Sequence, residues 1–175
     1  MHLLDTIDRW AKICPERLAH ISSNSAVTYE ELKQRSDALA CFISGQLPRD
    51  RSPIMVYGHK QSDMLVCFLA AAKAGHAYIP VDISVPAERV SSIWKNSDAS
   101  MAIALADWPP ACGIPNVLIN SNQLQEIYTK YNRQQPGEGL RVGEQDDYYI
   151  IYTSGSTGEP KGVRITLECL DSFLK

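Results

Sequence analysis

The chain has 175 residues, a length that fits one ordinary domain with a sizeable core. Hydrophobic residues make up 45% of it and charged residues 21%, a balance that excludes an intrinsically disordered chain. The formal net charge of -3 provides no basic field for a phosphate backbone, so we expect no nucleic-acid partner.

The opening residues predict an amphipathic helix, and no signal-like apolar core follows them. The longest apolar run, residues 64–72, is far too short to span a bilayer. Dispersed cysteines without a C-x-x-C pair indicate free thiols in a reducing compartment. They are Cys14, Cys41, Cys67, Cys112 and Cys169. We therefore expect a cytoplasmic chain without a membrane span.

Strand and helix signals then alternate along the chain. A capping box at Thr28 and Glu31 opens the first long helix, in which Leu32, Leu39 and Ile43 recur at helical spacing. Further helices are expected over residues 61–74, from Ser84 to residue 94, over residues 123–128 and after Thr166.

Short apolar runs between these helices are typical of buried strands, and they cover residues 53–57, 77–81, 101–105, 116–119 and 149–153. Residues 131–145, rich in glycine, have the composition of an internal loop. This alternation predicts an α/β fold with a layered sheet flanked by helices. Phe68 and Ile151 lie in the middle of apolar runs, so we expect both to be nearly fully buried.

The most informative stretch is residues 153–163, T-S-G-S-T-G-E-P-K-G-V, which follow an apolar strand directly. Glycine lets an anion approach the backbone closely, and consecutive N–H groups in a turn form an anion-binding nest. The stretch also contains several hydroxyls and the cation of Lys161. By composition alone such a loop is more often a surface turn; the specific string is what indicates a phosphate site.

The familiar nucleotide signatures do not match this stretch. A Walker A loop needs G-x-x-x-x-G-K-[ST], but Pro160 stands five places after Gly155, and Gly162 follows Lys161. The dinucleotide fingerprint G-x-G-x-x-G is also absent, and residues 162–165 predict a strand rather than a helix. We therefore expect a phosphate loop that joins two strands.

The string resembles the phosphate-binding signature of the acyl-adenylate-forming superfamily. Two weaker motifs precede it in the expected order: V-T-Y-E-E-L, from Val27, resembles the first core motif, and K-A-G-H-A-Y-I-P-V-D, from Lys73, resembles the second. The resemblance covers essentially the whole chain. It implies that ATP, with Mg²⁺ sharing its charge, is held through its β- and γ-phosphates by Thr153, Ser154, Gly155, Ser156, Thr157, Gly158 and Lys161.

Within that superfamily, residues 52–59 and 84–90 resemble the enzymes that activate D-alanine for the D-alanylation of teichoic acids. The resemblance implies that D-alanine attacks the α-phosphate of ATP to give D-alanyl-adenylate and pyrophosphate. The phosphopantetheine thiol of a D-alanyl carrier protein then takes the acyl group. Such enzymes are much longer, so we expect residues 1–175 to be the N-terminal portion of the large adenylation domain. Catalytic residues are expected downstream of Lys175, and the chain alone to be inactive.

Two alternatives remain open. The chain could belong to an adenylation domain for another amino or carboxylic acid, of the peptide-synthetase or acyl-CoA-synthetase type, or to a non-catalytic nucleotide-binding remnant. Other polar residues have simpler interpretations. Asp82 is expected to be a turn carboxylate, His59 a loop residue and His76 a packed side chain, since the histidines lack metal-ligand spacing and predict no metal site.

Overall fold

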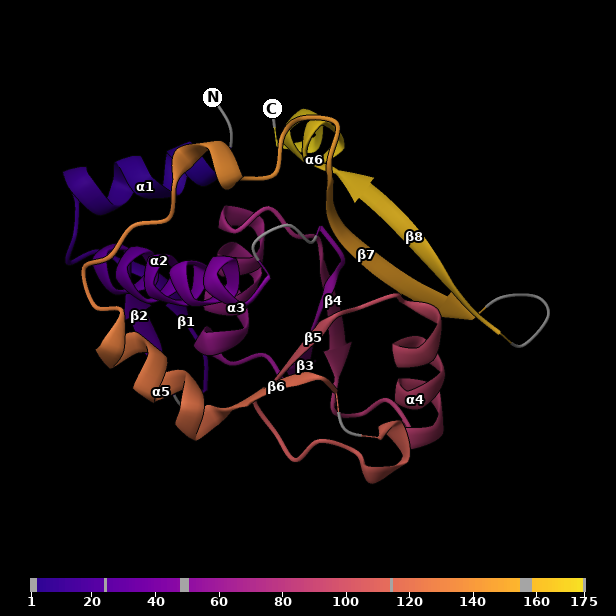
Figure 1. Cartoon of the computed structure of the whole chain (residues 1–175). Helices are drawn as coiled ribbons and strands as arrows, with labels where there is room; N and C mark the ends of the chain where they lie inside the picture. The colour runs from indigo at the N-terminus through magenta and orange to yellow at the C-terminus, as the bar shows by residue number, and fades with distance from the viewer. Residues whose placement is uncertain (1–2, 24, 48–50, 114, 155–158, 175) are drawn as a thin grey trace.

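The computed structural model describes residues 3–23, 25–47, 51–113, 115–154 and 159–174. Within these ranges a six-stranded sheet of order β6-β5-β3-β4-β7-β8 forms the centre of the molecule, and β1 and β2 form a separate hairpin (Figure 1). The strands are β1 Leu18–Ile21, β2 Ala26–Thr28, β3 Ile54–Gly58, β4 Tyr78–Asp82, β5 Met101–Ala104, β6 Val117–Asn120, β7 Asp147–Ser154 and β8 Pro160–Thr166. The predicted sheet flanked by helices is confirmed.

The helices begin and end close to their predicted limits. They are α1 Leu3–Ile13, α2 Tyr29–Gln46, α3 Ser62–Lys73, α4 Ala87–Asn96, α5 Ser121–Lys130 and α6 Leu167–Phe173, with two short 3-10 turns, η1 Pro110–Cys112 and η2 Glu138–Leu140. The predicted capping box is present, since Thr28 Oγ1 accepts from the Glu31 N–H at 3.2 Å and Glu31 Oε2 accepts from the Thr28 N–H at 2.9 Å. Gly75 follows α3 with a φ of 88°, the left-handed conformation expected of it.

Helices α2, α3 and α5 cover one face of the sheet, and α4 with η1 covers the other (Figure 1). Strand β3 shows both sides of this arrangement. Ile54 and Val56 pack in the core formed with α2, α3 and α5, whereas Met55 and Tyr57 pack in the core formed with α4. Burial on both faces explains why this strand has a continuous apolar sequence rather than an alternating one.

Two burial predictions are wrong. Ile151 is 46% exposed, and Phe68 is only half-buried. Strand β7 is paired with β4 at Tyr78 and Tyr149, and at Ile151 it is paired with β8 alone, so that side chain faces solvent. Phe68 stacks on Tyr78, with ring centroids 4.2 Å apart, at the margin of the core rather than inside it.

The β1–β2 hairpin was not predicted, and neither was a second capping box, formed by Asn120 and Gln123 at the start of α5. Residues 131–145 contain η2 and turns, and the Val142 N–H donates to the Ala72 carbonyl at 3.0 Å. The five cysteines, all inside the described ranges, are free thiols. No helix in those ranges combines the length and apolarity that crossing a membrane requires.

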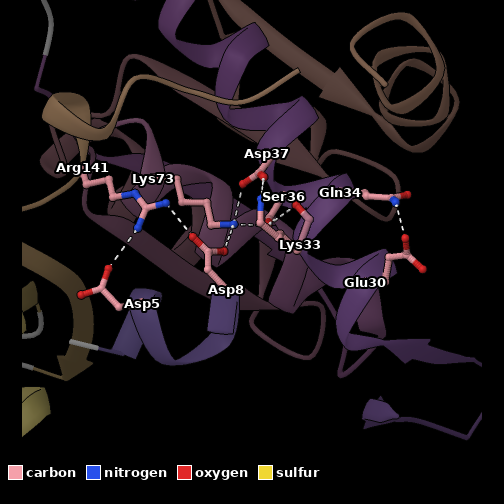
Figure 2. Close-up of polar contacts among 9 residues, drawn as sticks. All are labelled: Asp5, Asp8, Glu30, Lys33, Gln34, Ser36, Asp37, Lys73 and Arg141. Carbon is pink, nitrogen blue, oxygen red and sulfur yellow. Dashed lines mark hydrogen bonds and ion pairs between the residues drawn. The ribbon is translucent and has the colours of Figure 1, made fainter. Parts of the chain in front are cut away.

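The side chain of Lys73, at the end of α3, is fully buried in a cluster of polar groups (Figure 2). Its Nζ donates to Asp37 Oδ1 at 2.6 Å, to Ser36 Oγ at 3.0 Å and to Asp8 Oδ1 at 3.1 Å. These partners come from α1 and α2, so three helices meet at one ammonium group. We call Lys73 and these three partners the Lys73 cluster.

Arg141 connects this cluster to the segment that precedes β7. Its Nη2 lies 2.6 Å from Asp8 Oδ2, and its Nη1 lies 3.3 Å from Asp5 Oδ1 (Figure 2). Burial by itself would raise the pKa of Asp8, but the charges and hydrogen bonds of Lys73 and Arg141 outweigh it and hold that pKa below its ordinary value of 3.8. Asp8 is therefore ionised at neutral pH.

We expect Lys73→Met to lower the free energy of unfolding by about 3–5 kcal/mol, because the buried Asp37, which also pairs with Lys33, and the partly buried Asp8 would each lose an ionic partner. The measurement is urea denaturation at pH 7. Lys130→Met is the matched control, since Lys130 is exposed at the end of α5, and it should change stability by less than about 1 kcal/mol. Equal effects of the two substitutions would contradict this account of the cluster.

The lowered pKa of Asp8 also predicts a pH dependence. A carboxylate with a depressed folded-state pKa stabilises the fold above its unfolded-state pKa, and that stabilisation is lost as pH falls through the folded-state value. Stability should therefore decrease as pH falls below about 4, and it should decrease less in Asp8→Asn than in the wild type. Thermal melts between pH 7 and pH 2 measure both slopes, and identical slopes would show that Asp8 contributes nothing.

Candidate functional site

The β7–β8 hairpin brings together three of the seven residues predicted to bind phosphate. The strands are antiparallel, with Thr153 opposite Lys161 and Ser154 opposite Pro160. The side chains of Thr153, Ser154 and Lys161 are all exposed at this end of the hairpin. The other four predicted residues lie outside the described ranges, so their expected role in phosphate binding stays a prediction. They are Gly155, Ser156, Thr157 and Gly158.

The hairpin projects from the central sheet and extends past the C-terminal end of α4 (Figure 1). Residues of β7 alternate between its two sides. Ile150 and Tyr152 pack against the core formed with α4, and Ile151 between them faces solvent. This alternation is the ordinary pleat of a strand, and it turns the Tyr152 side chain toward α4.

Gly162 makes room for Tyr152 on the hairpin. It stands opposite Tyr152 in the β7–β8 register, and a Cβ atom at residue 162 would lie 3.0 Å from Ile150 Cγ2 and 3.2 Å from Tyr152 Cζ. The tyrosine ring therefore lies across β8 at a place where a side chain would crowd it. From there its hydroxyl donates to the main-chain oxygen of Asn96 at 3.1 Å. Burial raises the pKa of Tyr152, which keeps the hydroxyl protonated as a donor.

A second contact joins Glu159, the residue that directly precedes β8, to the same helix end. Asn96 Nδ2 donates to Glu159 Oε2 at 3.3 Å. Sequence analysis identified none of Tyr152, Asn96 or Glu159 as functional. No local pattern could have indicated these contacts, because the partners are 56 and 63 residues apart in the chain.

Charge at the hairpin is arranged so that one cation is available to a ligand. Arg164 Nη1 lies 3.0 Å from Asp147 Oδ2, so Arg164 is already paired. Among the residues that the structure describes, no carboxylate lies within ion-pair distance of Lys161. An exposed ammonium group on the residue opposite Thr153 fits an anionic ligand such as a polyphosphate.

Within the described residues, no group of three or more His, Cys, Asp or Glu side chains is placed to hold a metal ion. His59 Nδ1 and Asp82 Oδ2 are 2.7 Å apart, at the ends of β3 and β4. The N–H of Ser84 donates to Asp82 Oδ1 at 2.9 Å, and this bond, with further hydrogen bonds from Ser84 and His59, lowers the pKa of Asp82 to about 2. His76 is buried, with Nδ1 2.8 Å from the Ser52 carbonyl oxygen. The interpretations of Asp82 as a turn carboxylate and His76 as a packed side chain are confirmed.

Two cavities lie away from the hairpin end. One of about 390 Å³ lies between α2, α5 and β6 and is lined by Phe42, Ile127 and Tyr131 among others. Another of about 410 Å³ lies at the N-terminal ends of β3, β4 and β7, and Arg51 and Arg164 are among its lining residues. Thr153, Ser154 and Lys161 line neither of these two cavities.

The chain is similar to known proteins in sequence and in fold. A D-alanine–D-alanyl carrier protein ligase of Bacillus cereus (strain B4264) is 46% identical over 175 residues, which are 100% of this chain and 34% of that protein. The chain thus spans about a third of the length of the curated relatives it matches.

Solved structures share the fold at low sequence identity. VinN, solved with 3-methylaspartate, superposes with a TM-score of 0.80 at 20% identity, over 95% of this chain and 47% of VinN. The Klebsiella oxytoca NpsA N-terminal subdomain, in complex with 3-hydroxybenzoyl-AMSN, superposes with a TM-score of 0.77 at 23% identity, over 94% of this chain and 41% of that one. The family model described as AMP-binding enzyme matches residues 7–170. Because that match includes almost all of the chain, the chain belongs to the AMP-binding enzyme family.

Proposed function

We propose that residues 1–175 form the N-terminal portion of the large adenylation domain of an ATP-dependent, AMP-forming ligase that activates D-alanine. The observation that carries this proposal is the 46% identity to D-alanine–D-alanyl carrier protein ligases along the whole chain. The exposed Lys161 across from Thr153 supports it, because a polyphosphate needs a cation and hydroxyl donors at that place.

In the proposed reaction the carboxylate of D-alanine attacks the α-phosphate of ATP, and pyrophosphate leaves with the electrons of the broken P–O bond. Lys161 and the hydroxyls of Thr153 and Ser154 would hold the β- and γ-phosphates, together with the loop residues Gly155, Ser156, Thr157 and Gly158. Their task is to orient the chain of phosphates and to neutralise the charge that grows on the leaving group. The ammonium of Lys161 is suited to this, since it can follow a moving charge.

The partners follow from the same proposal. Mg²⁺ would share the phosphate charge, bound mainly through phosphate oxygens and water as is usual for this ion. The phosphopantetheine thiol of a D-alanyl carrier protein would take the acyl group from the adenylate, for the D-alanylation of teichoic acids. We place the reaction in the cytoplasm, where ATP is available and free thiols persist. Catalytic residues would lie downstream of Lys175.

A second candidate is the adenylation of another acid. The structural relatives were solved with 3-methylaspartate and with a 3-hydroxybenzoyl compound, so this fold accommodates different acyl groups in other proteins. ATP–pyrophosphate exchange with the complete gene product that contains these residues separates the candidates. We expect exchange with D-alanine and much weaker exchange with L-alanine, aspartate or 3-hydroxybenzoate. Exchange driven only by another acid would replace the D-alanine assignment, and none with any acid would favour a non-catalytic remnant.

In the same assay Lys161→Ala should lower exchange by about 100-fold, the typical effect of removing one charge-stabilising group. Lys161→Arg keeps the charge but changes its shape, and it should retain more activity than the alanine variant. Lys130→Ala, which removes an exposed lysine from α5, is the control and should exchange at the wild-type rate. Wild-type rates in both Lys161 variants would rule out its assigned role.

A further inference from the structure

We propose that Tyr152 and Asn96 are positioning residues that fix the end of the β7–β8 hairpin, which carries Thr153 and Lys161, to the end of helix α4. This inference rests on the proposed function, since it assigns a role in ATP binding to residues that do not themselves contact ATP. It concerns Tyr152 on strand β7 and Glu159, the residue that precedes strand β8.

The first contact provides a hydrogen-bond donor for a main-chain carbonyl at the end of α4 that has no partner within the helix. Asn96 is the last residue of α4, and the final carbonyls of a helix have no partner within it. The Tyr152 hydroxyl donates to the Asn96 carbonyl at 3.1 Å, and Tyr152 directly precedes Thr153 on strand β7. Gly162 keeps the ring in place for this bond, because a side chain there would lie only 3.0–3.2 Å from Ile150 and the ring.

The second contact uses the side chain of the same residue. Asn96 Nδ2 donates to Glu159 Oε2 at 3.3 Å, and Glu159 directly precedes strand β8. Asn96 at the end of α4 therefore accepts a hydrogen bond from β7 and donates one to the residue before β8. The two contacts together restrain both strands of the hairpin near Thr153 and Lys161.

The restraint matters because the sheet does little to hold this part of the hairpin. Strand β7 is paired with β4 at Tyr149 and Tyr78, and Tyr149 lies three residues before Tyr152. Beyond it β7 is paired with β8, while Ile151 and Val163 are exposed. The position of Lys161 relative to the rest of the molecule then depends on the contacts with α4. Phosphate binding is sensitive to displacements well below 1 Å, so loosening these contacts should weaken it.

The test measures the KM for ATP and the KM for D-alanine in pyrophosphate exchange by the complete gene product. Tyr152→Phe removes the first hydrogen bond and Asn96→Ala the second. Each should raise the KM for ATP by about three- to ten-fold, the range expected for loss of one hydrogen bond. The KM for D-alanine and the Tm should stay near the wild-type values. A general structural role would change all of these together.

Glu159 allows charge and hydrogen bonding to be separated. Glu159→Gln keeps the acceptor oxygen and should keep the KM for ATP at or below the wild-type value, whereas Glu159→Ala should raise it. Asn96→Ala combined with Glu159→Ala should be no worse than either change alone, because both remove the same bond. Gln34→Ala is the matched control, since it breaks an exposed amide–carboxylate bond of 3.0 Å to Glu30 within α2 (Figure 2), a helix that does not contact the β7–β8 hairpin end in Figure 1.

The outcomes distinguish this inference from the proposed function. If the unsubstituted protein exchanges pyrophosphate and Tyr152→Phe and Asn96→Ala keep its KM for ATP, the positioning role is wrong and the proposed function stands. If the unsubstituted protein shows no exchange with any acid, the proposed function fails and the role in ATP binding fails with it.

Discussion

The buried ammonium group of Lys73 constrains the N-terminal half of this molecule more than any other single group. A charge removed from water must be paired and hydrogen-bonded, and an unpaired one would cost several kcal/mol. Lys73 meets this requirement with Asp37 and Ser36 of α2 and with Asp8 of α1. Helix α1 is thereby fixed against α2 and α3, and Arg141 extends the same network to the segment before β7.

The β7–β8 hairpin is built on the opposite principle. It is joined to the rest of the sheet by a short pairing of β7 with β4, and its end carries the exposed side chains of Thr153, Ser154 and Lys161 instead of a packed core. Loops that bind ligands are commonly held in this way by a rigid neighbour while their own contacts stay sparse. Here that neighbour is α4, through the carbonyl and side chain of Asn96.

Local signals in the sequence were sufficient for most elements. The Thr28–Glu31 capping box, the left-handed Gly75 and the N-cap of α6 at Thr166 each depend on nearby residues, and each is present. Predictions that required tertiary information were less successful. The apolar run around Ile151 matched a buried strand, but its exposure depends on where β7 leaves the sheet. Nothing in the local pattern around Lys73 distinguished a fully buried lysine from an ordinary helix-ending one.

The candidate site also has one part that the sequence predicts and one part that depends on tertiary contacts. The residue types suited to phosphate, such as Lys161, can be recognised from a short string, whereas the support from Asn96 depends on contacts across more than fifty residues. The most direct measurement is a crystal structure of the complete gene product with ATP and D-alanine. We expect the β- and γ-phosphates to lie within hydrogen-bond distance of Lys161 Nζ and the Thr153 hydroxyl. The hydrogen bonds that join Asn96 to Tyr152 and to Glu159 should be retained. Phosphates bound elsewhere, for example beside Asp82 at the ends of β3 and β4, would contradict this expectation.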